Sequence, residues 1–155
     1  MSILSPSLFY SPSFYTVEQS TNISQLILVW SPSKGSMIHD HADAHCLMRV
    51  LSGTLRESRY STPTATTPPS PPHIIRETTY TAGQVTYMSD SLGVHKISNP
   101  DPERPAVSLH LYTPPNAARE GCHVWDERVG GRSHVSQNNY YSVLGVKGGR
   151  VEDLM

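Results

Sequence analysis

The chain has 155 residues and a formal net charge of −1, and its charged side chains are sparse and scattered. This length is sufficient to bury one hydrophobic core, so we expect a single soluble domain. The sequence has no basic run that could follow a phosphate backbone, which argues against a nucleic-acid partner. Residues 1–15 contain neither a basic leader nor a long apolar stretch. We therefore expect no secretory signal, no membrane partner and a cytoplasmic, monomeric protein.

The cysteine count and the content of turn-forming residues further limit the class of protein. The chain contains two cysteines, Cys46 and Cys122. A reducing compartment disfavours a structural disulfide, so we expect both to be thiols. Thirteen prolines and ten glycines indicate many turns between short elements.

The N-terminal region lacks the pattern of a folded element. Residues 1–21 are rich in Ser, Pro, Tyr and Phe and follow neither a helical nor a strand period, so we expect an irregular lead-in there. The apolar run 25–30 predicts a buried strand, which the turn residues 31–35 end. The ordered domain is expected to cover residues 22–145, and residues 146–155 to form a polar tail.

The middle of the chain reads as strands separated by turns. Residues 44–51 and 55–61 flank Ser52-Gly53-Thr54 and predict a hairpin. Residues 61–72 are a Ser/Thr/Pro tract, which cannot supply the donors of a sheet and predicts a surface loop. Residues 78–88 predict a second hairpin around Ala82-Gly83.

The later strands complete the pattern. Residues 93–98 predict a short strand, and residues 106–112 alternate strictly, with Ser108, His110 and Tyr112 on one face. Residues 122–126 and 132–143 predict the last β elements, and no stretch has a helical period. Many short strands with frequent turns predict an all-β antiparallel barrel or double-sheet jelly roll.

A candidate metal site lies between these strands. His39 and His41 are two residues apart, so on an extended strand both side chains point to one face. His95, on a later strand, is the best third ligand by sequence, and three imidazoles would leave open positions for a substrate. A His-x-His pair alone is more often a surface or core feature. We expect His45 to be structural, and the remaining loop histidines to face solvent: His73, His123 and His134.

The spacing of these residues resembles a known superfamily. Gly35-x3-His39-x-His41-x4-Cys46-x6-Gly53, followed by His95-x3-Asn99, is similar to the two signature motifs of the cupins. Most metal-binding cupins place a glutamate where this chain has Cys46. Without that carboxylate, a bound cation keeps its full charge, which favours an anionic substrate ligand such as a thiolate.

Longer matches point to one family. Ile38-His-Asp-His41, His45-Cys46, residues 89–95, residues 107–115 and Cys122-His-Val-Trp-Asp126 together resemble the cysteine dioxygenases, which are cupins. The matches run in order from about Leu26 to Asp126. The resemblance implies a cupin-type double-sheet jelly-roll barrel that binds Fe(II). It also implies oxidation of the small-molecule thiol L-cysteine by O2 to cysteine sulfinic acid.

The resemblance also assigns roles to residues. It implies that His39, His41 and His95 are the metal ligands, and that Cys46 forms a thioether crosslink with Tyr112. It implies a catalytic relay of Ser108, His110 and Tyr112 together with Cys46, and the alternation of residues 106–112 independently places the relay on one face. The residues implied to contact the substrate are Leu28, Trp30, His110 and Tyr112, with Cys122 near the pocket mouth. Taken alone, Leu28, Trp30 and Tyr112 would be core residues.

The N-terminal part departs from the family pattern. Family members have a helical segment ahead of the first strands, and a Tyr-Thr-Arg segment whose arginine binds the substrate carboxylate. Here the helical segment is largely missing, and Tyr15-Thr16-Val17 has valine in place of arginine. A truncated or mis-spliced N-terminus explains this better than true divergence, because the lead-in lacks the pattern of a folded element. The alternatives are a dioxygenase of another small thiol, such as 3-mercaptopropionate, and an inactive cupin paralogue.

Overall fold

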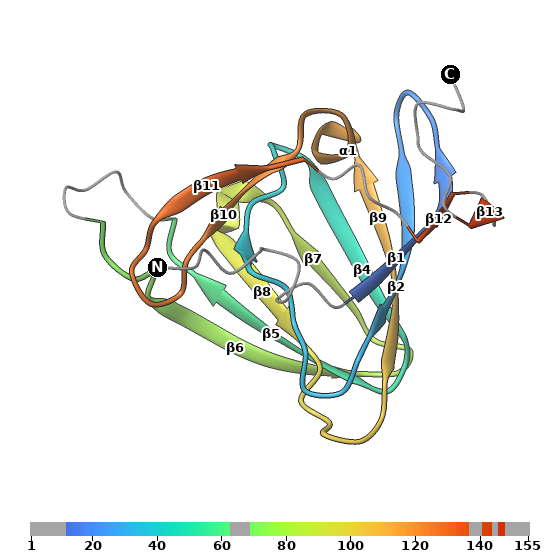
Figure 1. Cartoon of the computed structure of the whole chain (residues 1–155), viewed down its shortest axis with the longest axis horizontal. Coiled ribbons are helices and arrows are strands. Elements are labelled where there is room, and N and C mark those ends of the chain that lie inside the picture. Colours follow the sequence, from blue (N-terminus) through green and yellow to red (C-terminus); the bar gives the residue numbers. More distant parts are fainter. Residues whose placement is uncertain (1–11, 63–68, 137–140, 144–145, 148–155) are drawn as a thin grey trace, which may run out of the picture.

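Two antiparallel β-sheets form the body of the molecule (Figure 1). The computed structural model describes residues 12–62, 69–136, 141–143 and 146–147. The larger sheet has the order β13-β12-β1-β2-β9-β4-β7, and the smaller one the order β11-β10-β3-β8-β5-β6. All strand pairs are antiparallel except β1 with β12. The predicted all-β, double-sheet architecture is confirmed.

The strands are short, as the turn-rich composition predicts. The larger sheet consists of β1 (Pro12–Gln19), β2 (Ser24–Trp30), β4 (His45–Ser52), β7 (Val85–Met88), β9 (Ala106–Thr113), β12 (Ser142–Val143) and β13 (Val146–Lys147). The smaller sheet consists of β3 (Ile38–His39), β5 (Thr54–Tyr60), β6 (Ile74–Thr81), β8 (Val94–Ser98), β10 (Cys122–Trp125) and β11 (Arg132–Val135). The helices that the structure describes are the 3-10 turn η2 (Asp90–Leu92) and α1 (Asn116–Glu120). Within the described part of the chain, no helix has the length and apolarity needed to cross a bilayer.

The core lies between the two sheets. Strand β2 alternates buried and half-buried residues along its length, as the period-two geometry of a strand dictates. Its inward side chains pack with those of β4, β5, β8 and β9 in one cluster: Leu26, Leu28, Trp30, Met48, Val50, Leu55, Ile97 and Ala106. Trp30 is 2% exposed and is among the largest fully buried side chains. This cluster fixes β2 and β9 side by side, which matters for the site below.

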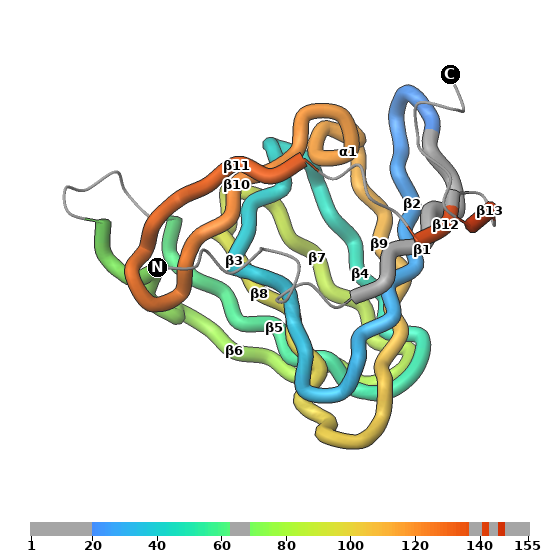
Figure 2. Tube along the Cα trace, viewed as in Figure 1, coloured from blue at the N-terminus to red at the C-terminus, as the bar shows by residue number. Residues whose placement is uncertain are grey.

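Both predicted hairpins are wrong. Strand β4 pairs with β7 and β9, whereas β5 pairs with β6 and β8, so the chain changes sheets at Gly53. Likewise β6 belongs to the smaller sheet and β7 to the larger one, so the chain crosses again at Gly83. Figure 2 follows the trace around these corners. A tight turn between two alternating runs has the same local sequence in a hairpin and at a barrel corner, and only long-range pairing distinguishes them.

The two corner glycines make a matched pair for a stability test. Gly53 has a φ of 76° and Gly83 a φ of 89°, a region that costs an L-residue about 1–2 kcal/mol. A Cβ on Gly53 would lie 2.9 Å from the Cβ of Ala106, whereas a Cβ on Gly83 would meet nothing within 4 Å. We expect Gly53→Ala to reduce the free energy of unfolding by about 1–3 kcal/mol more than Gly83→Ala. Urea denaturation of both variants measures this difference, and equal losses would contradict it.

The N-terminal expectation needs a correction. Residues 12–19 form strand β1, which pairs antiparallel with β2 from Pro12↔Trp30 to Gln19↔Ser24, so the irregular lead-in is wrong for this stretch. A strand can be specified by its partner's backbone without an apolar period of its own, and β2 provides that partner. Val17 is the extra residue of a bulge in this ladder. Residues 1–11 lie outside the described part of the chain.

Other boundaries differ in detail. Strand β6 begins at Ile74, four residues before the predicted start, and the predicted strand 132–143 contains only β11 and β12 in its described parts. The short strand β13 lies in the predicted polar tail and pairs with β12. The segments of the Ser/Thr/Pro loop that are described, 61–62 and 69–72, contain no strand, in agreement with the prediction.

Candidate metal centre

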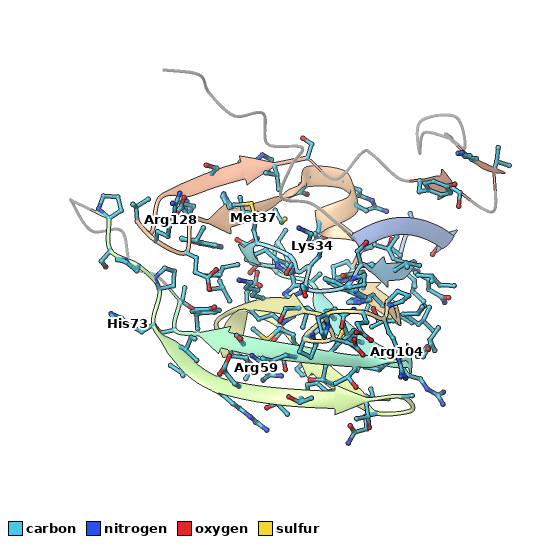
Figure 3. The ribbon with its side chains drawn as sticks, turned by 60° about the horizontal axis from the view of Figure 1, so that its bottom comes forward. Lys34, Met37, Arg59, His73, Arg104 and Arg128 are labelled. Carbon is cyan, nitrogen blue, oxygen red and sulfur yellow. The ribbon has the colours of Figure 1, made fainter. Side chains whose placement is uncertain are left out.

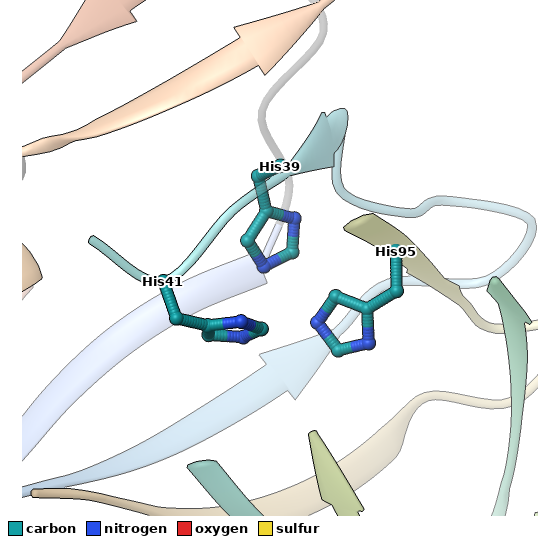
Figure 4. A group of neighbouring side chains, drawn as sticks. All are labelled: His39, His41 and His95. Carbon is teal, nitrogen blue, oxygen red and sulfur yellow. The ribbon is translucent and has the colours of Figure 1, made fainter. Parts of the chain in front are cut away.

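Three histidines from separate segments meet inside the barrel. His39 and His95 are direct partners in the β3–β8 ladder, and His41 follows β3 in the chain. Each offers one nitrogen, and these nitrogens lie within 4.8 Å of one another. Figure 4 shows the three imidazoles turned toward a common point. The predicted cluster is thus brought together, because a long-range strand pair completes what the His-x-His spacing begins.

A strained turn holds His41 in place. Ala42 and Asp43 have φ values of 50° and 60°, in the left-handed region that L-residues rarely adopt. The Asp90 carboxylate accepts the backbone N–H of His41 on one oxygen and that of Asp43 on the other, each at 2.8 Å. The side-chain amide of Asn116 donates to the Ala42 carbonyl at 2.7 Å. Strain that the surroundings enforce is a feature of functional sites.

Burial keeps His39 and His95 neutral. Burial, followed by the field of His41, lowers the pKa of His39 to about 4, and burial likewise lowers the pKa of His95 well below its usual value. His39 Nδ1 lies 3.0 Å from the Met37 carbonyl, and as the donor it leaves Nε2 as an acceptor. Neither ring nitrogen of His41 has a hydrogen-bond partner, since Asp90 Oδ1 is 3.6 Å from its Nδ1. Neutral imidazoles with free lone pairs are the form that binds metal.

This donor set fits a divalent transition metal. Imidazole nitrogens suit iron, zinc, copper and nickel, whereas calcium and magnesium require oxygen ligands. Among the described residues, the group close enough to share one ion contains only the three histidines. Three protein ligands leave coordination positions open, which is the arrangement of a catalytic rather than a structural site.

A polar chain runs along the inner face of β9 beside this cluster. The indole N–H of Trp30 donates to Ser108 Oγ at 2.8 Å, and Ser108 Oγ lies 2.8 Å from His110 Nε2. Indole is a donor only, so Ser108 Oγ accepts from it and keeps its own proton to donate to His110 Nε2. Burial, then the fields of His41 and His39, lowers the pKa of His110 to about 3, so the ring is neutral. Its one proton is therefore on Nδ1, 3.2 Å from the Tyr112 hydroxyl oxygen.

Cys46 and Tyr112 lie directly opposite each other across the β4–β9 ladder. Cys46 is 2% exposed, and its Sγ is 3.9 Å from His110 Nδ1. Burial raises the pKa of Cys46 to about 12, although a hydrogen bond with Tyr112 partly opposes the shift. The sulfur is therefore a protonated thiol at neutral pH. The structure brings the two predicted crosslink residues together, next to His110.

The remaining predicted residues are placed as follows. Leu28 is 3% exposed and pairs in register with Ser108, so it lies in the core against the polar chain. Cys122 is buried in a smaller cluster with Ala117 and Val124, on the strand beside β3. His45 is exposed on the outer face, where its Nδ1 lies 2.6 Å from the Tyr87 hydroxyl, and so is away from the metal ligands.

Three residues at the site are not apparent from the sequence. Glu57 is 1% exposed and its Oε1 lies 2.8 Å from His95 Nδ1. Asp90 and Asn116 hold the turn after His41. Glu57 is in phase with Leu55 on β5, so the strand period itself signals an inward carboxylate. Asp90 and Asn116 carry no such signal, since they lie in short irregular elements.

Comparisons with known proteins agree with the geometry. Residues 14–128 match the family Cysteine dioxygenase type I. The cysteine dioxygenase type 1 of Rattus norvegicus is 36% identical over 124 residues, which is 79% of this chain and 58% of that protein. The Homo sapiens protein of the same name is 34% identical over 125 residues, again 79% of this chain and 58% of the relative. The chain thus spans little more than half the length of these relatives.

Solved structures confirm the fold. A protein with a double-stranded β-helix domain from Klebsiella pneumoniae superposes with a TM-score of 0.54 at 16% identity, covering 88% of this chain and 99% of that one. A cupin superfamily protein from Desulfitobacterium hafniense gives a TM-score of 0.51 at 9% identity, covering 66% and 77%. The predicted cupin-type barrel is therefore confirmed. Because the family match covers most of the chain and contains the three clustered histidines, the chain belongs to the cysteine dioxygenase type I family.

Proposed function

We propose that this chain is a non-haem Fe(II) thiol dioxygenase that converts L-cysteine and O2 to cysteine sulfinic acid. The observation that carries the proposal is the buried cluster of His39, His41 and His95, with nitrogens within 4.8 Å, beside the inward-facing Tyr112. Family membership supplies the reaction class. In the reaction RSH + O2 → RSO2H, the sulfur loses four electrons and both oxygen atoms enter the product.

The ligand set favours a thiolate substrate. A ferrous ion held by His39, His41 and His95 would supply the redox chemistry that activates O2. An imidazole is never an anionic ligand at neutral pH, and Cys46 is a protonated thiol, so these four residues contribute no negative charge to the site. A substrate that brings its own negative charge on sulfur then compensates the charge of the site.

The polar chain on β9 orients the hydroxyl group of Tyr112. His110 Nδ1 lies 3.2 Å from the Tyr112 hydroxyl oxygen, and this contact orients the phenol group that carries the proton. We assign that proton to the substrate carboxylate or to developing charge at the sulfur centre. Ser108 and Trp30 contribute indirectly in this scheme, because they fix the tautomer of His110. Leu28 and Trp30 are proposed to wall the substrate pocket.

A thioether between Cys46 Sγ and the Tyr112 ring is also proposed, supported by their position as direct ladder partners. Forming it removes two hydrogens, and O2, a substrate of the proposed reaction, is the oxidant. Intact mass after incubation with iron, cysteine and O2 measures that loss. Cys46→Ala serves as the control, since it has no sulfur at this position. An unchanged mass in the parent protein would contradict the crosslink.

Oxygen uptake with product analysis tests the activity. The iron-loaded protein should consume O2 when L-cysteine is added and form the sulfinic acid, with slow turnover because Val17 provides no guanidinium for the carboxylate. Parallel assays with 3-mercaptopropionate and without thiol separate the two dioxygenase reactions from a non-catalytic cupin. Iron loading without thiol-dependent uptake would refute the dioxygenase proposal, and turnover equal to that of a full-length relative would refute the expected weakness.

A further inference from the structure

The residue behind His95 is a buried carboxylate. Glu57 extends from β5 into the barrel and is 1% exposed. Its Oε1 lies 2.8 Å from His95 Nδ1. Its Oε2 forms an ion pair with Arg59 Nη2 at 3.1 Å, and accepts from the Tyr80 hydroxyl at 3.2 Å and the Thr86 hydroxyl at 3.3 Å. These contacts of the carboxylate are all polar, and one of them is with a predicted metal ligand.

The surroundings of Glu57 provide the partners that a buried carboxylate needs. Burying a carboxylate is costly unless it is paired and hydrogen-bonded, and here both conditions are met. Arg59, labelled in Figure 3, is the paired cation, and its side chain is 14% exposed. Arg59 also donates to the Tyr87 carbonyl at 2.6 Å, so its charge is shared with a second acceptor. The pairing therefore leaves part of the carboxylate's negative charge directed at His95.

This contact gives His95 a different hydrogen-bond partner from those of the other two histidines. Ionised Glu57 accepts only, so His95 must carry its proton on Nδ1 and present the Nε2 lone pair to the cluster. The Nδ1 of His39 lies instead against the neutral Met37 carbonyl, and His41 Nδ1 has no hydrogen-bond partner. A charged acceptor fixes the ring and raises its basicity as a ligand. Among the three, His95 alone lies within hydrogen-bond distance of a carboxylate, because Asp90 is 3.6 Å from His41 Nδ1.

We propose that Glu57 is a positioning residue that acts through His95. It fixes the tautomer and the ring orientation of His95, and it brings a negative charge to that ligand through one hydrogen bond. Arg59 and Tyr80 set how much of that charge reaches the ring, since both occupy Oε2. The proposal depends on the proposed function only in requiring that the three histidines bind iron.

The test compares metal affinity and iron reduction potential in Glu57→Gln and in the parent protein. The amide keeps the shape and an acceptor oxygen but has no charge. We expect Fe(II) affinity, measured by chelator competition under anaerobic conditions, to fall about 10–100-fold. The reduction potential of the bound iron should become more positive, because a less basic ligand stabilises the ferric state less. Glu77→Gln is the matched control, since Glu77 is an exposed glutamate on the adjacent strand that accepts from Ser58 at 2.7 Å.

A second variant covers the case in which Glu57→Gln does not fold. Tyr80→Phe removes one donor from Oε2 at a half-buried position, so the carboxylate keeps more charge for His95. The potential should then shift in the opposite direction, to more negative values, which a purely structural role of this network would not produce. If the parent protein binds no iron, the proposed function fails. If it binds iron while the potential and affinity are unchanged in every variant that folds, the role of Glu57 is overturned.

Discussion

Replacing His95 by alanine is expected to abolish iron retention. The nitrogens that converge within 4.8 Å come from three side chains, so removing His95 leaves only His39 and His41, which are two residues apart in the chain. Two imidazoles bind a ferrous ion far more weakly than three, and the loss should be at least about 100-fold. Metal analysis of purified, Fe(II)-reconstituted protein after desalting measures the retained iron directly. Oxygen uptake with L-cysteine should disappear in the same preparation.

A control variant at a histidine outside the cluster distinguishes iron binding at the site from non-specific iron binding. His73 is exposed beside the Ser/Thr/Pro loop and lies at the edge of the molecule in Figure 3. His73→Ala should retain iron at the parent level. The apo form of His95→Ala must melt close to the parent apo protein, so that iron loss is not a consequence of unfolding. Iron retained at the parent stoichiometry after His95→Ala would remove the basis of the metal site.

The metal-free protein is expected to lose stability steeply as the pH falls below about 6.5. Folding lowers the pKa of His39 to about 4 and of His110 to about 3, and lowers that of His95 in the same direction. The unfolded chain therefore binds more protons than the folded one in this window. Stability from these groups is complete above the unfolded pKa and is lost as the pH falls toward the folded values. Each group contributes up to about 1.4 kcal/mol per pH unit.

Urea denaturation of the apo protein at a series of pH values measures this slope. His110→Gln removes one of the three groups without touching the metal ligands, so its slope should be shallower by up to about 1.4 kcal/mol per pH unit. Iron-loaded protein should follow a different curve, because protons and metal compete for His39 and His95. A free energy of unfolding that stays constant from pH 7 to pH 5 would show that these histidines are not held neutral in the fold.

Local sequence patterns predicted where the strands lie in the chain, but not which strands pair with one another. The apolar run of β2 and the alternation of β9 were sufficient to place both strands and to put Ser108, His110 and Tyr112 on one face. The two predicted hairpins failed because Gly53 and Gly83 supply the positive φ that either a hairpin or a sheet-to-sheet corner needs. Strand β1 was missed because its pairing depends on β2 rather than on its own composition.

The same distinction applies to the candidate site, where local spacing predicts some residues and long-range pairing brings in the others. The spacing of His39 and His41 predicts a shared face, but the contribution of His95 depends on the β3–β8 pairing, which spacing cannot reveal. Glu57 was missed because charged residues are presumed to face solvent, although its phase with Leu55 points inward. The left-handed turn at Ala42 and Asp43 contains no glycine or asparagine that would predict it from the sequence. Its hydrogen-bond partners, Asp90 and Asn116, come from distant segments of the chain.

The ladder that joins His39 to His95 also has a consequence for the order of folding. Strand β3 has only two residues and pairs with β8 and β10, which lie far away in the sequence, so it gains nothing from local contacts. Closing such long loops costs entropy before the contacts repay it, and barrels of this kind fold slowly for that reason. The metal ligands therefore converge only once the smaller sheet has assembled. An ion bound there would stabilise the closed barrel and not its precursors, so metal binding would add stability only to the completed fold.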